Sequence, residues 1–256
     1  MSRGKAGNII NLANRKTVCS QCAARHLCLP IGVAAGELGL LESNIIHHRS
    51  LRRGQPIYRA GDPFGSIYAI RSGAAKTYVT TVDGEEHVTG FHLSGELVGL
   101  DGIHSEYHWC SAIALDTTSV CELPLDRLEE LAGKIPSLQH HLLRIMSQKI
   151  LHDEQMLLLL GKRGAESRLA SLLLSIAGRY RERGYSRNHF RLVMFHTDIA
   201  SYLGLTPETV SRLFHRFQAQ GLIALDGKTV RLLDFAQMQA LSGMGHDARG
   251  KVSSSP

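Results

Sequence analysis

The chain has 256 residues and a formal net charge of +6, and it contains no apolar run of about 18 residues that could span a membrane. It also lacks a charged start followed by an unbroken apolar stretch, so we expect a cytoplasmic protein without a secretory signal or a membrane partner. Residues 162–231 contain twelve Lys or Arg against five Asp or Glu, whereas no Lys or Arg lies between Lys76 and Arg127, so binding to a polyanion is expected near the C-terminal end.

Three of the five cysteines lie close together in the spacing C-x2-C-x5-C, at Cys19, Cys22 and Cys28. Clustered thiols in a reducing cytosol are more often metal ligands or redox groups than disulfides. A four-thiolate site needs a further ligand, from Cys110 or Cys121. We favour Cys121, because a ligand in the last predicted strand before a long helix would let the chemistry of the site move that helix. Four thiolates suit both Zn2+ and an iron–sulfur cluster, and a redox dithiol of Cys19 with Cys22 is a further alternative.

The N-terminal half predicts a small all-β domain. Short segments of alternating apolar and polar residues run from about Ile45 to Leu125, separated by glycine-containing turns about every 8 to 12 residues. We therefore predict a flexible N-terminus over residues 1–18, a cysteine segment that contributes to the four-thiolate site over 19–30 and a β-roll sensor domain over 31–126.

The stretch "SGELVGL", at Ser94–Leu100, is similar to the start of a segment that binds the phosphate of a cyclic nucleotide. A cyclic phosphate needs a cation, preferably the guanidinium of an arginine. No Lys or Arg occurs from Thr77 to Asp126. We therefore expect a β-roll of the cyclic-nucleotide-binding kind that binds no cyclic nucleotide.

A long helix is predicted after the β-roll, because apolar residues recur at helical spacing and no glycine follows Gly133 until Gly161. We assign residues 127–161 to this helix. A coiled-coil seam in 3-4-3-4-3 spacing runs along it, through Leu143, Met146, Ile150, Asp153, Leu157 and Leu160. A seam needs a partner helix, which a symmetric dimer supplies, although the stripe could instead pack on its own β-roll.

Asp153 interrupts this seam between Ile150 and Leu157. In a parallel pair of helices the two Asp153 side chains would approach each other, and like charges in a partly dry interface repel. We therefore predict a dimer that is weak unless a group bound at Cys121 stabilises it. The alternative is that Asp153 turns outward and the seam follows a neighbouring stripe.

The C-terminal part, residues 162–242, predicts a winged helix-turn-helix. A helix over 165–183 and a strand over 190–195 come first. Thr197 should cap the first helix of the motif, and Thr206 should cap the second, with Gly204 forming the turn between them. A hairpin around Asp226–Gly227, both suited to the positive φ of a type I′ turn, forms the wing, and a disordered tail is expected over 243–256.

The second helix of this motif presents polar side chains of the kinds that read bases in the major groove. Arginine donates two hydrogen bonds to guanine, glutamate accepts from cytosine, and serine serves either partner. The first turns of such a helix usually enter the groove. The alternative is an ordinary amphipathic helix. The candidate DNA-binding residues are Glu208, Thr209, Ser211, Arg212 and Arg216.

The order of these features resembles the CRP/FNR superfamily, and the residues from Cys19 to about Leu241 are similar to its fumarate-and-nitrate-reduction regulator (FNR) group of oxygen-responsive activators. The stretches that carry the resemblance are "CSQC" to "CLP", "IYAIRSGAAKTY", "VTGFHLSGELVGLD", "SVCELP", "LLLLGKRGAESRLA" and "DIASYLGLTPETVSRL". The resemblance implies an α+β fold, with a β-roll sensor domain, a long dimerisation helix and a winged helix-turn-helix.

The resemblance also implies an oxygen-labile [4Fe-4S] cluster on Cys19, Cys22, Cys28 and Cys121, with Cys110 spare. It implies a homodimer, when the cluster is loaded, that binds a palindrome of double-stranded DNA with half-sites similar to TTGAT. Base reading is then assigned to Glu208, Ser211 and Arg212. Contact with RNA polymerase is assigned to the acidic turn of Asp83, Gly84, Glu85 and Glu86.

Two alternatives stay open beside the oxygen-sensing transcription regulator. A zinc- or thiol-redox-controlled regulator of the same fold has the same cysteine pattern. An iron–sulfur enzyme is disfavoured, because an enzyme needs a pocket with positioned acid, base or nucleophile groups, whereas the organised polar residues here face outward on a helix.

Overall fold

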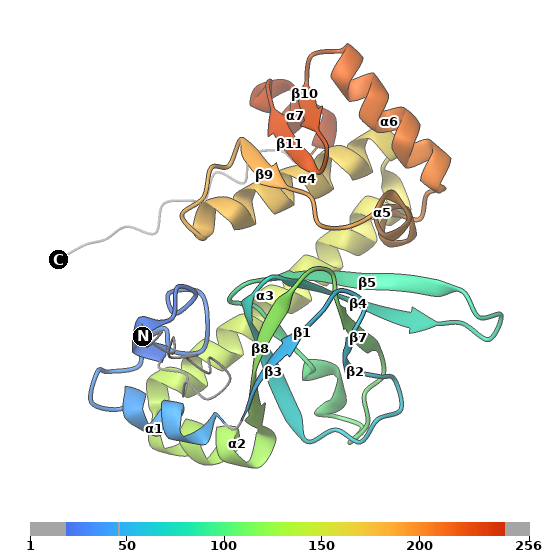
Figure 1. The fold of residues 1–256 in the computed structure, drawn as a ribbon. Helices are drawn as coiled ribbons and strands as arrows, with labels where there is room; N and C mark the ends of the chain where they lie inside the picture. The colour runs from blue at the N-terminus through green and yellow to red at the C-terminus, as the bar shows by residue number, and fades with distance from the viewer. Residues whose placement is uncertain (1–18, 46, 244–256) are drawn as a thin grey trace, which may run out of the picture.

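The computed structural model describes residues 19–45 and 47–243. The flexible N-terminus predicted over 1–18 lies outside the described residues, as does the predicted tail after Gly243. The described chain forms two lobes joined by one long helix, α3 (Figure 1). None of the helices in the described part of the chain is long and apolar enough to cross a membrane.

The first lobe is the predicted β-roll, built from two antiparallel four-stranded sheets. The strand orders are β1-β8-β3-β6 and β2-β7-β4-β5. The strands are β1 (His47–Leu51), β2 (Pro56–Tyr58), β3 (Ser66–Ser72), β4 (Ala74–Thr80), β5 (Glu86–Leu93), β6 (Leu97–Val98), β7 (Ser111–Ala114) and β8 (Thr118–Pro124). Gly73, with φ of 82°, makes the turn from β3 to β4, where a Cβ atom would lie 2.5 Å from the carbonyl oxygen of Thr117. Only glycine fits that turn.

Helices cover one side of the β-roll. They are the short 3-10 helix η2 (Cys19–Gln21), α1 (Leu38–Asn44), α2 (Leu125–Lys134) and α3 (Pro136–Lys162), with a further 3-10 turn, η3 (Leu100–Gly102), inside the roll. The single helix predicted over 127–161 is wrong, because the chain breaks at Ile135 (φ −121°, ψ 89°) and restarts with Pro136 at the first helical position. Proline disfavours helical geometry in the residue before it. The whole predicted seam nevertheless lies on α3.

The second lobe is a winged helix-turn-helix, as predicted. Its elements are α4 (Ala165–Glu182), β9 (His189–Arg191), α5 (His196–Leu203), α6 (Pro207–Ala219), β10 (Ile223–Asp226), β11 (Thr229–Leu232) and α7 (Phe235–Ser242). The three strands pair in the order β10-β11-β9. The strand predicted over 190–195 is shorter and begins one residue earlier.

Two local predictions in this lobe are wrong. Thr197 does not cap α5; Phe195 is the N-cap residue, and its backbone N–H donates to Oδ2 of Asp198 at 2.9 Å. In the wing, Asp226 stays in β10 opposite Thr229, and only Gly227 has positive φ, 56°. The turn is therefore made one residue later than the type I′ turn that we expected.

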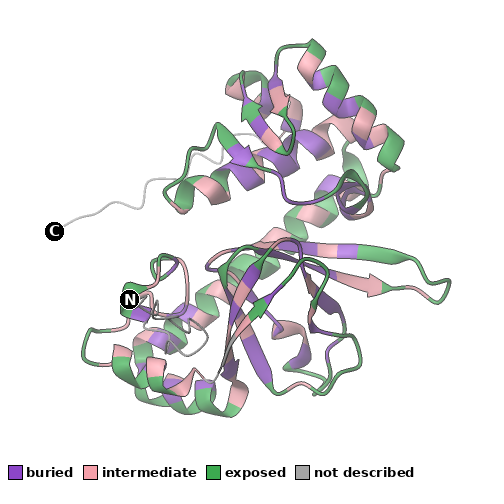
Figure 2. Cartoon of the chain, in the orientation of Figure 1, coloured by how far each residue is buried: buried purple, intermediate pink, exposed green. Residues whose placement is uncertain are grey.

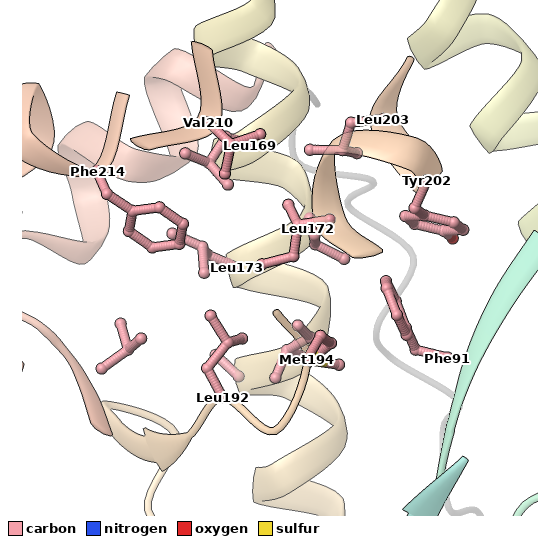
Figure 3. Close-up of a cluster of buried hydrophobic side chains, with 14 of the residues drawn as sticks. Phe91, Leu169, Leu172, Leu173, Leu192, Met194, Tyr202, Leu203, Val210 and Phe214 are labelled. Carbon is pink, nitrogen blue, oxygen red and sulfur yellow. The ribbon is translucent and has the colours of Figure 1, made fainter. Parts of the chain in front are cut away.

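The largest hydrophobic core is shared between the two lobes. Side chains of α4, α5 and α6 pack together with residues of β4 and β5 (Figure 3). At the junction, the rings of Phe91 and Tyr202 lie 5.0 Å apart between centroids. In Figure 2 the buried segments of the second lobe lie on its inner faces. The β-roll thus forms part of the support of the helix-turn-helix lobe.

Candidate metal centre and nucleic-acid interface

Four of the five cysteines line one cavity beside the β-roll: Cys19, Cys22, Cys28 and Cys121. The backbone of Cys22 donates to the carbonyl of Cys19 at 3.1 Å, which closes the turn after η2. Cys121 lies in β8, opposite Ala69 of β3. Strand pairing therefore brings the distant cysteine to the same space as the N-terminal group.

Burial is the main influence on the pKa values of three of these thiols. It raises the pKa of Cys19 to about 11, and that of Cys28 and of Cys121 to about 12. The neighbouring thiols raise each of these pKa values further, whereas Arg71, which also lines the cavity, lowers those of Cys19 and Cys121. Thiolates are the form that binds metals, so a group bound here would displace protons.

The donor set fits a thiolate-bound cofactor. The remaining wall of the cavity is largely apolar, with Leu29, Leu41 and Ile67 among its residues. Arg71 supplies a positive charge beside four potential thiolates, which would offset the negative charge of a four-thiolate site. Over residues 19–45 and 47–243, no three His, Cys, Asp or Glu side chains are already arranged to hold a single metal ion.

Cys110 lies elsewhere, buried inside the β-roll. Its Sγ donates to Oδ2 of Asp101 at 3.4 Å and lies 3.9 Å from the hydroxyl of Tyr58. Burial, followed by the charge of Asp101, raises the pKa of Cys110 to about 12. This thiol is therefore separated from the other four and held in a hydrogen-bonded network.

The apolar stripe of α3 faces solvent. Leu143, Met146, Ile150 and Leu157 expose between 42% and 72% of their surface. The alternative in which they pack on their own β-roll is therefore wrong for these four residues, although Leu160 is half-buried. Exposed apolar side chains in a seam pattern indicate a surface that another helix covers.

Asp153 lies on the same exposed stripe, with its side chain 51% exposed. It pairs with Lys149, one helical turn earlier. An exposed pair of this spacing contributes about 0.3–0.5 kcal/mol. Lys149 therefore offsets only part of the charge that Asp153 would bring to a paired helix.

Helix α6 presents a polar face to solvent. Thr206 caps it as predicted, because its Oγ1 accepts a hydrogen bond from the backbone of Thr209 at 3.2 Å. Its apolar residues Val210, Leu213, Phe214 and Phe217 are buried. The helix is thereby fixed to the lobe by one face, and the opposite face is free.

The candidate base-reading residues differ in their exposure to solvent and in their contacts with other residues. Glu208 and Arg212 are exposed, and Ser211 is half-buried on the same face. The hydroxyl of Thr209 lies 3.0 Å from that of Thr206, so it takes part in the cap. Arg216 forms an ion pair with Glu166 of α4. Glu208, Ser211 and Arg212 are therefore the side chains best placed to reach a ligand.

The acidic turn lies at the tip of the β4–β5 hairpin, which projects from the β-roll (Figure 1). Asp83, Gly84 and Glu85 are exposed. Glu86 begins β5, and its carboxylate lies 3.3 Å from Nζ of Lys76. Three of the four predicted contact residues are thus exposed at the tip, and the fourth is paired with Lys76 of the same hairpin.

A salt-bridge cluster between the lobes is absent from the sequence-based predictions. We call it the interdomain clamp; it consists of Glu96 in the β-roll with Arg179 of α4 and Arg183, the C-cap residue of that helix. Arg179 Nε donates to Glu96 Oε1 at 2.9 Å, and Arg183 Nη2 donates to the same oxygen at 2.6 Å. Burial opposes ionisation of Glu96, but the two arginines outweigh it and lower the pKa of Glu96 to about 2.

A second buried pair joins the lobes nearby. Nζ of Lys76 lies 2.7 Å from Oδ1 of Asp198, with the two side chains 10% and 9% exposed. The backbone of Val88 donates to the hydroxyl of Ser201 at 2.9 Å. No local sequence signal indicates either contact, because the paired residues are 122 and 113 positions apart in the chain.

Known proteins share both lobes. Residues 167–241 match the family model of the Crp-like helix-turn-helix domain, and residues 48–134 match that of the cyclic nucleotide-binding domain. The transcriptional activator protein anr of Pseudomonas aeruginosa is 48% identical over 225 residues, 88% of this chain and 92% of that protein. The fumarate and nitrate reduction regulatory protein of Vibrio cholerae is 42% identical over 231 residues, 90% of this chain and 92% of that protein. The structure of FixK2 from Bradyrhizobium japonicum superposes with a TM-score of 0.71 and 30% identity, covering 78% of this chain and 98% of that one.

Proposed function

Because the chain belongs to the FNR group of the CRP/FNR family of DNA-binding transcription regulators, we propose that it senses oxygen through a [4Fe-4S] cluster. Like those relatives, it is a regulator and not an enzyme. The ligands would be Cys19, Cys22, Cys28 and Cys121. The observation that supports this assignment is that these four thiols line one cavity, whereas Cys110 lies apart from them.

The chain itself connects this cavity to α3. Cys121 lies three residues before the end of β8, and α2 follows that strand directly. Leu29, beside Cys28, belongs to the same buried cluster as Leu131 of α2 and Leu138 of α3. When bound, the cluster would be the group that reacts with oxygen. Holding the cysteine segment in place would then stabilise the N-terminal end of α3 and align its exposed stripe for pairing.

The activity that the cluster would control is binding to DNA as a homodimer. We propose that paired α3 helices place two copies of α6 on a palindrome with half-sites similar to TTGAT, read by Glu208, Ser211 and Arg212. The exposed acidic tip, Asp83–Glu85, would contact RNA polymerase. We expect the β-roll to bind no cyclic nucleotide, because no Lys or Arg occurs from Thr77 to Asp126 to bind its phosphate.

Anaerobic purification followed by an absorbance spectrum and by analysis of iron, sulfide and zinc tests the cofactor. We expect about four irons and four sulfides per protomer, and an absorbance band that air removes. Stoichiometric zinc without sulfide would instead establish the zinc-controlled regulator, whose ligands would be the same four thiols. Protein without either metal would point to thiol-redox control.

Replacing Arg212 by alanine should relax base discrimination. Loss of a two-hydrogen-bond contact to guanine costs about 1–3 kcal/mol at that base pair, so affinity for the palindrome should fall while affinity for random DNA changes little. Fluorescence anisotropy with both duplexes measures the difference. Arg181→Ala, which removes an exposed charge from the far end of α4, is the matched control. An equal loss on both duplexes would show that Arg212 contacts only phosphate.

Replacing Asp153 by alanine should produce a dimer that persists in air. Two like charges about 4 Å apart repel by up to about 4 kcal/mol at an effective dielectric constant near 20, and Lys149 offsets part of this. We therefore expect the aerobic dimer dissociation constant to fall by at least about tenfold, as measured by sedimentation. Glu154→Ala removes the same charge one position along α3 and should change the aerobic dimer dissociation constant little. An aerobic Asp153→Ala protein that stays as monomeric as the wild type would contradict the proposal.

A further inference from the structure

One histidine lies on the buried face of α3. His141 follows Leu138 by three residues and precedes Ile145 by four, so helical spacing places the three side chains on one face. Leu138 and Ile145 belong to the hydrophobic cluster that also contains Leu29 and Cys28. His141 itself is only 8% exposed. An imidazole therefore occupies a position that suits an apolar side chain.

Neither nitrogen of this ring is satisfied. Among residues 19–45 and 47–243, four buried side-chain nitrogen or oxygen atoms make no hydrogen bond of normal geometry, and two of them are Nδ1 and Nε2 of His141. A buried polar group without a partner destabilises the folded state, because it has lost its hydrogen bonds to water. The position of His141 therefore costs stability unless another state of the protein supplies the partner.

The polar group beside the ring is the backbone of Cys28. Burial, followed by the charge of Arg144, lowers the pKa of His141, whereas the backbone of Cys28 raises it. A carbonyl that faces a ring N–H has this effect. The carbonyl of Cys28 already accepts from the backbone of Ile31 at 3.1 Å, and a carbonyl oxygen has a second lone pair. An unused donor of α3 and an acceptor with room for it thus lie next to each other.

The chain after Cys28 follows the start of α3. The backbone of Val33 donates to the carbonyl of Pro30 at 3.1 Å, which continues the turn that Ile31 begins. At Gly32, a Cβ atom would lie 3.9 Å from Cβ of Ser137, in the first turn of α3. The thiol of Cys28 lines the cavity of the four cysteines. Cys28 therefore has its side chain at the candidate metal centre and its backbone beside α3.

We propose that His141 is a positioning residue through which the metal centre acts on α3, donating a hydrogen bond to the carbonyl of Cys28 when that cysteine is bound to the cluster. This inference rests on the proposed [4Fe-4S] cluster and names the residue of α3 that responds to it. A hydrogen bond among apolar side chains is strengthened by the absence of competing water. It fixes the first turns of α3, and with them the direction in which Leu143 and Met146 project.

His141→Leu tests the inference, because the two states of the protein should respond with opposite signs. Without the cluster, the variant lacks two unsatisfied nitrogens, so its urea midpoint should equal or exceed that of the wild type. With the cluster, the dimer dissociation constant should rise by about tenfold or more, because each protomer loses one hydrogen bond. Sedimentation of the anaerobic protein measures this constant. Iron and sulfide content should stay at the wild-type level, since His141 is not a ligand.

Two further variants separate the hydrogen bond from packing. His141→Gln keeps an N–H donor and should hold the anaerobic dissociation constant within about threefold of the wild type. His140→Ala removes the exposed imidazole one position earlier and should change neither state.

Three results would overturn the inference: an anaerobic His141→Leu dimer as tight as that of the wild type, an equal weakening in His141→Gln, or a lower urea midpoint in the cluster-free His141→Leu protein. Each of these is measured beside wild-type protein with its full iron content. A wild type without iron and sulfide would instead overturn the proposed function.

Discussion

Single replacement of Cys19, Cys22, Cys28 or Cys121 by serine should abolish cluster binding and cluster-dependent DNA binding. A hydroxyl is a poor ligand for iron, and the four thiols that line the cavity are the full set that a cubane cluster requires. Iron and sulfide content of the anaerobic protein, with anisotropy on the palindrome, measures both losses. We expect less than about a tenth of the wild-type iron in each variant.

Cys110→Ser is the matched control, because it makes the same chemical change at a buried thiol away from the cavity. Serine can keep the contact with Asp101, so stability and iron content should stay close to those of the wild type. Loss of iron in Cys110→Ser with full iron in Cys121→Ser would exchange the two roles and contradict the assignment. Far-ultraviolet circular dichroism of every variant shows whether a loss of iron follows from loss of the fold.

Removing the carboxylate of the interdomain clamp should be the most damaging change to stability. Glu96→Ala leaves Arg179 and Arg183, whose side chains are 19% and 6% exposed, without their anion. Breaking one side of such a buried pair costs about 3–5 kcal/mol, and the partial exposure of Glu96 places the expected loss near the lower end. Urea unfolding gives the free energy, and hydrogen exchange in α4 shows whether the loss is local.

The pH dependence of the same protein offers an independent test. The pKa of Glu96 is lowered from 4.5 to about 2 in the folded protein, so the folded state releases this proton more readily than the unfolded state. Its contribution is therefore complete above about pH 4.5 and is lost as the pH falls toward 2. Glu96→Ala should lack this part of the acid destabilisation.

Glu182→Ala removes an exposed carboxylate from the C-terminal end of α4 and should leave both the free energy of unfolding and its pH dependence nearly unchanged. Glu96→Gln keeps the hydrogen-bond acceptor without the charge and should lie between the wild type and Glu96→Ala. If Glu96→Ala unfolds at the same urea concentration as Glu182→Ala, the clamp does not hold the two lobes together.

The amino-acid sequence alone determined the local elements of this protein. Alternating segments between glycine turns predicted the β-roll, and the spacing of Thr206, Pro207 and the apolar residues of α6 predicted a capped, amphipathic helix. Both signals are local, because strand and helix periods place neighbouring residues on one face without reference to the rest of the chain. The break before Pro136 also has a local signal, because proline disfavours helical geometry in the residue before it. A single helix is predicted nevertheless, because the helical spacing of apolar residues continues across the break.

Only the tertiary structure decided which distant groups meet. Local patterns left both Cys110 and Cys121 as candidates for the fourth ligand, but the pairing of β8 with β1 and β3 brings Cys121 alone to the N-terminal cysteines. The carboxylate of Asp198 accepts a hydrogen bond from the backbone of Phe195, the N-cap residue of α5, while it is paired with Lys76, 122 residues away. Glu96 meets Arg179 and Arg183 across 83 and 87 residues. Such contacts depend on how the sheets and helices pack. The pattern of residues within one element does not show which charged residue of another element will lie beside it.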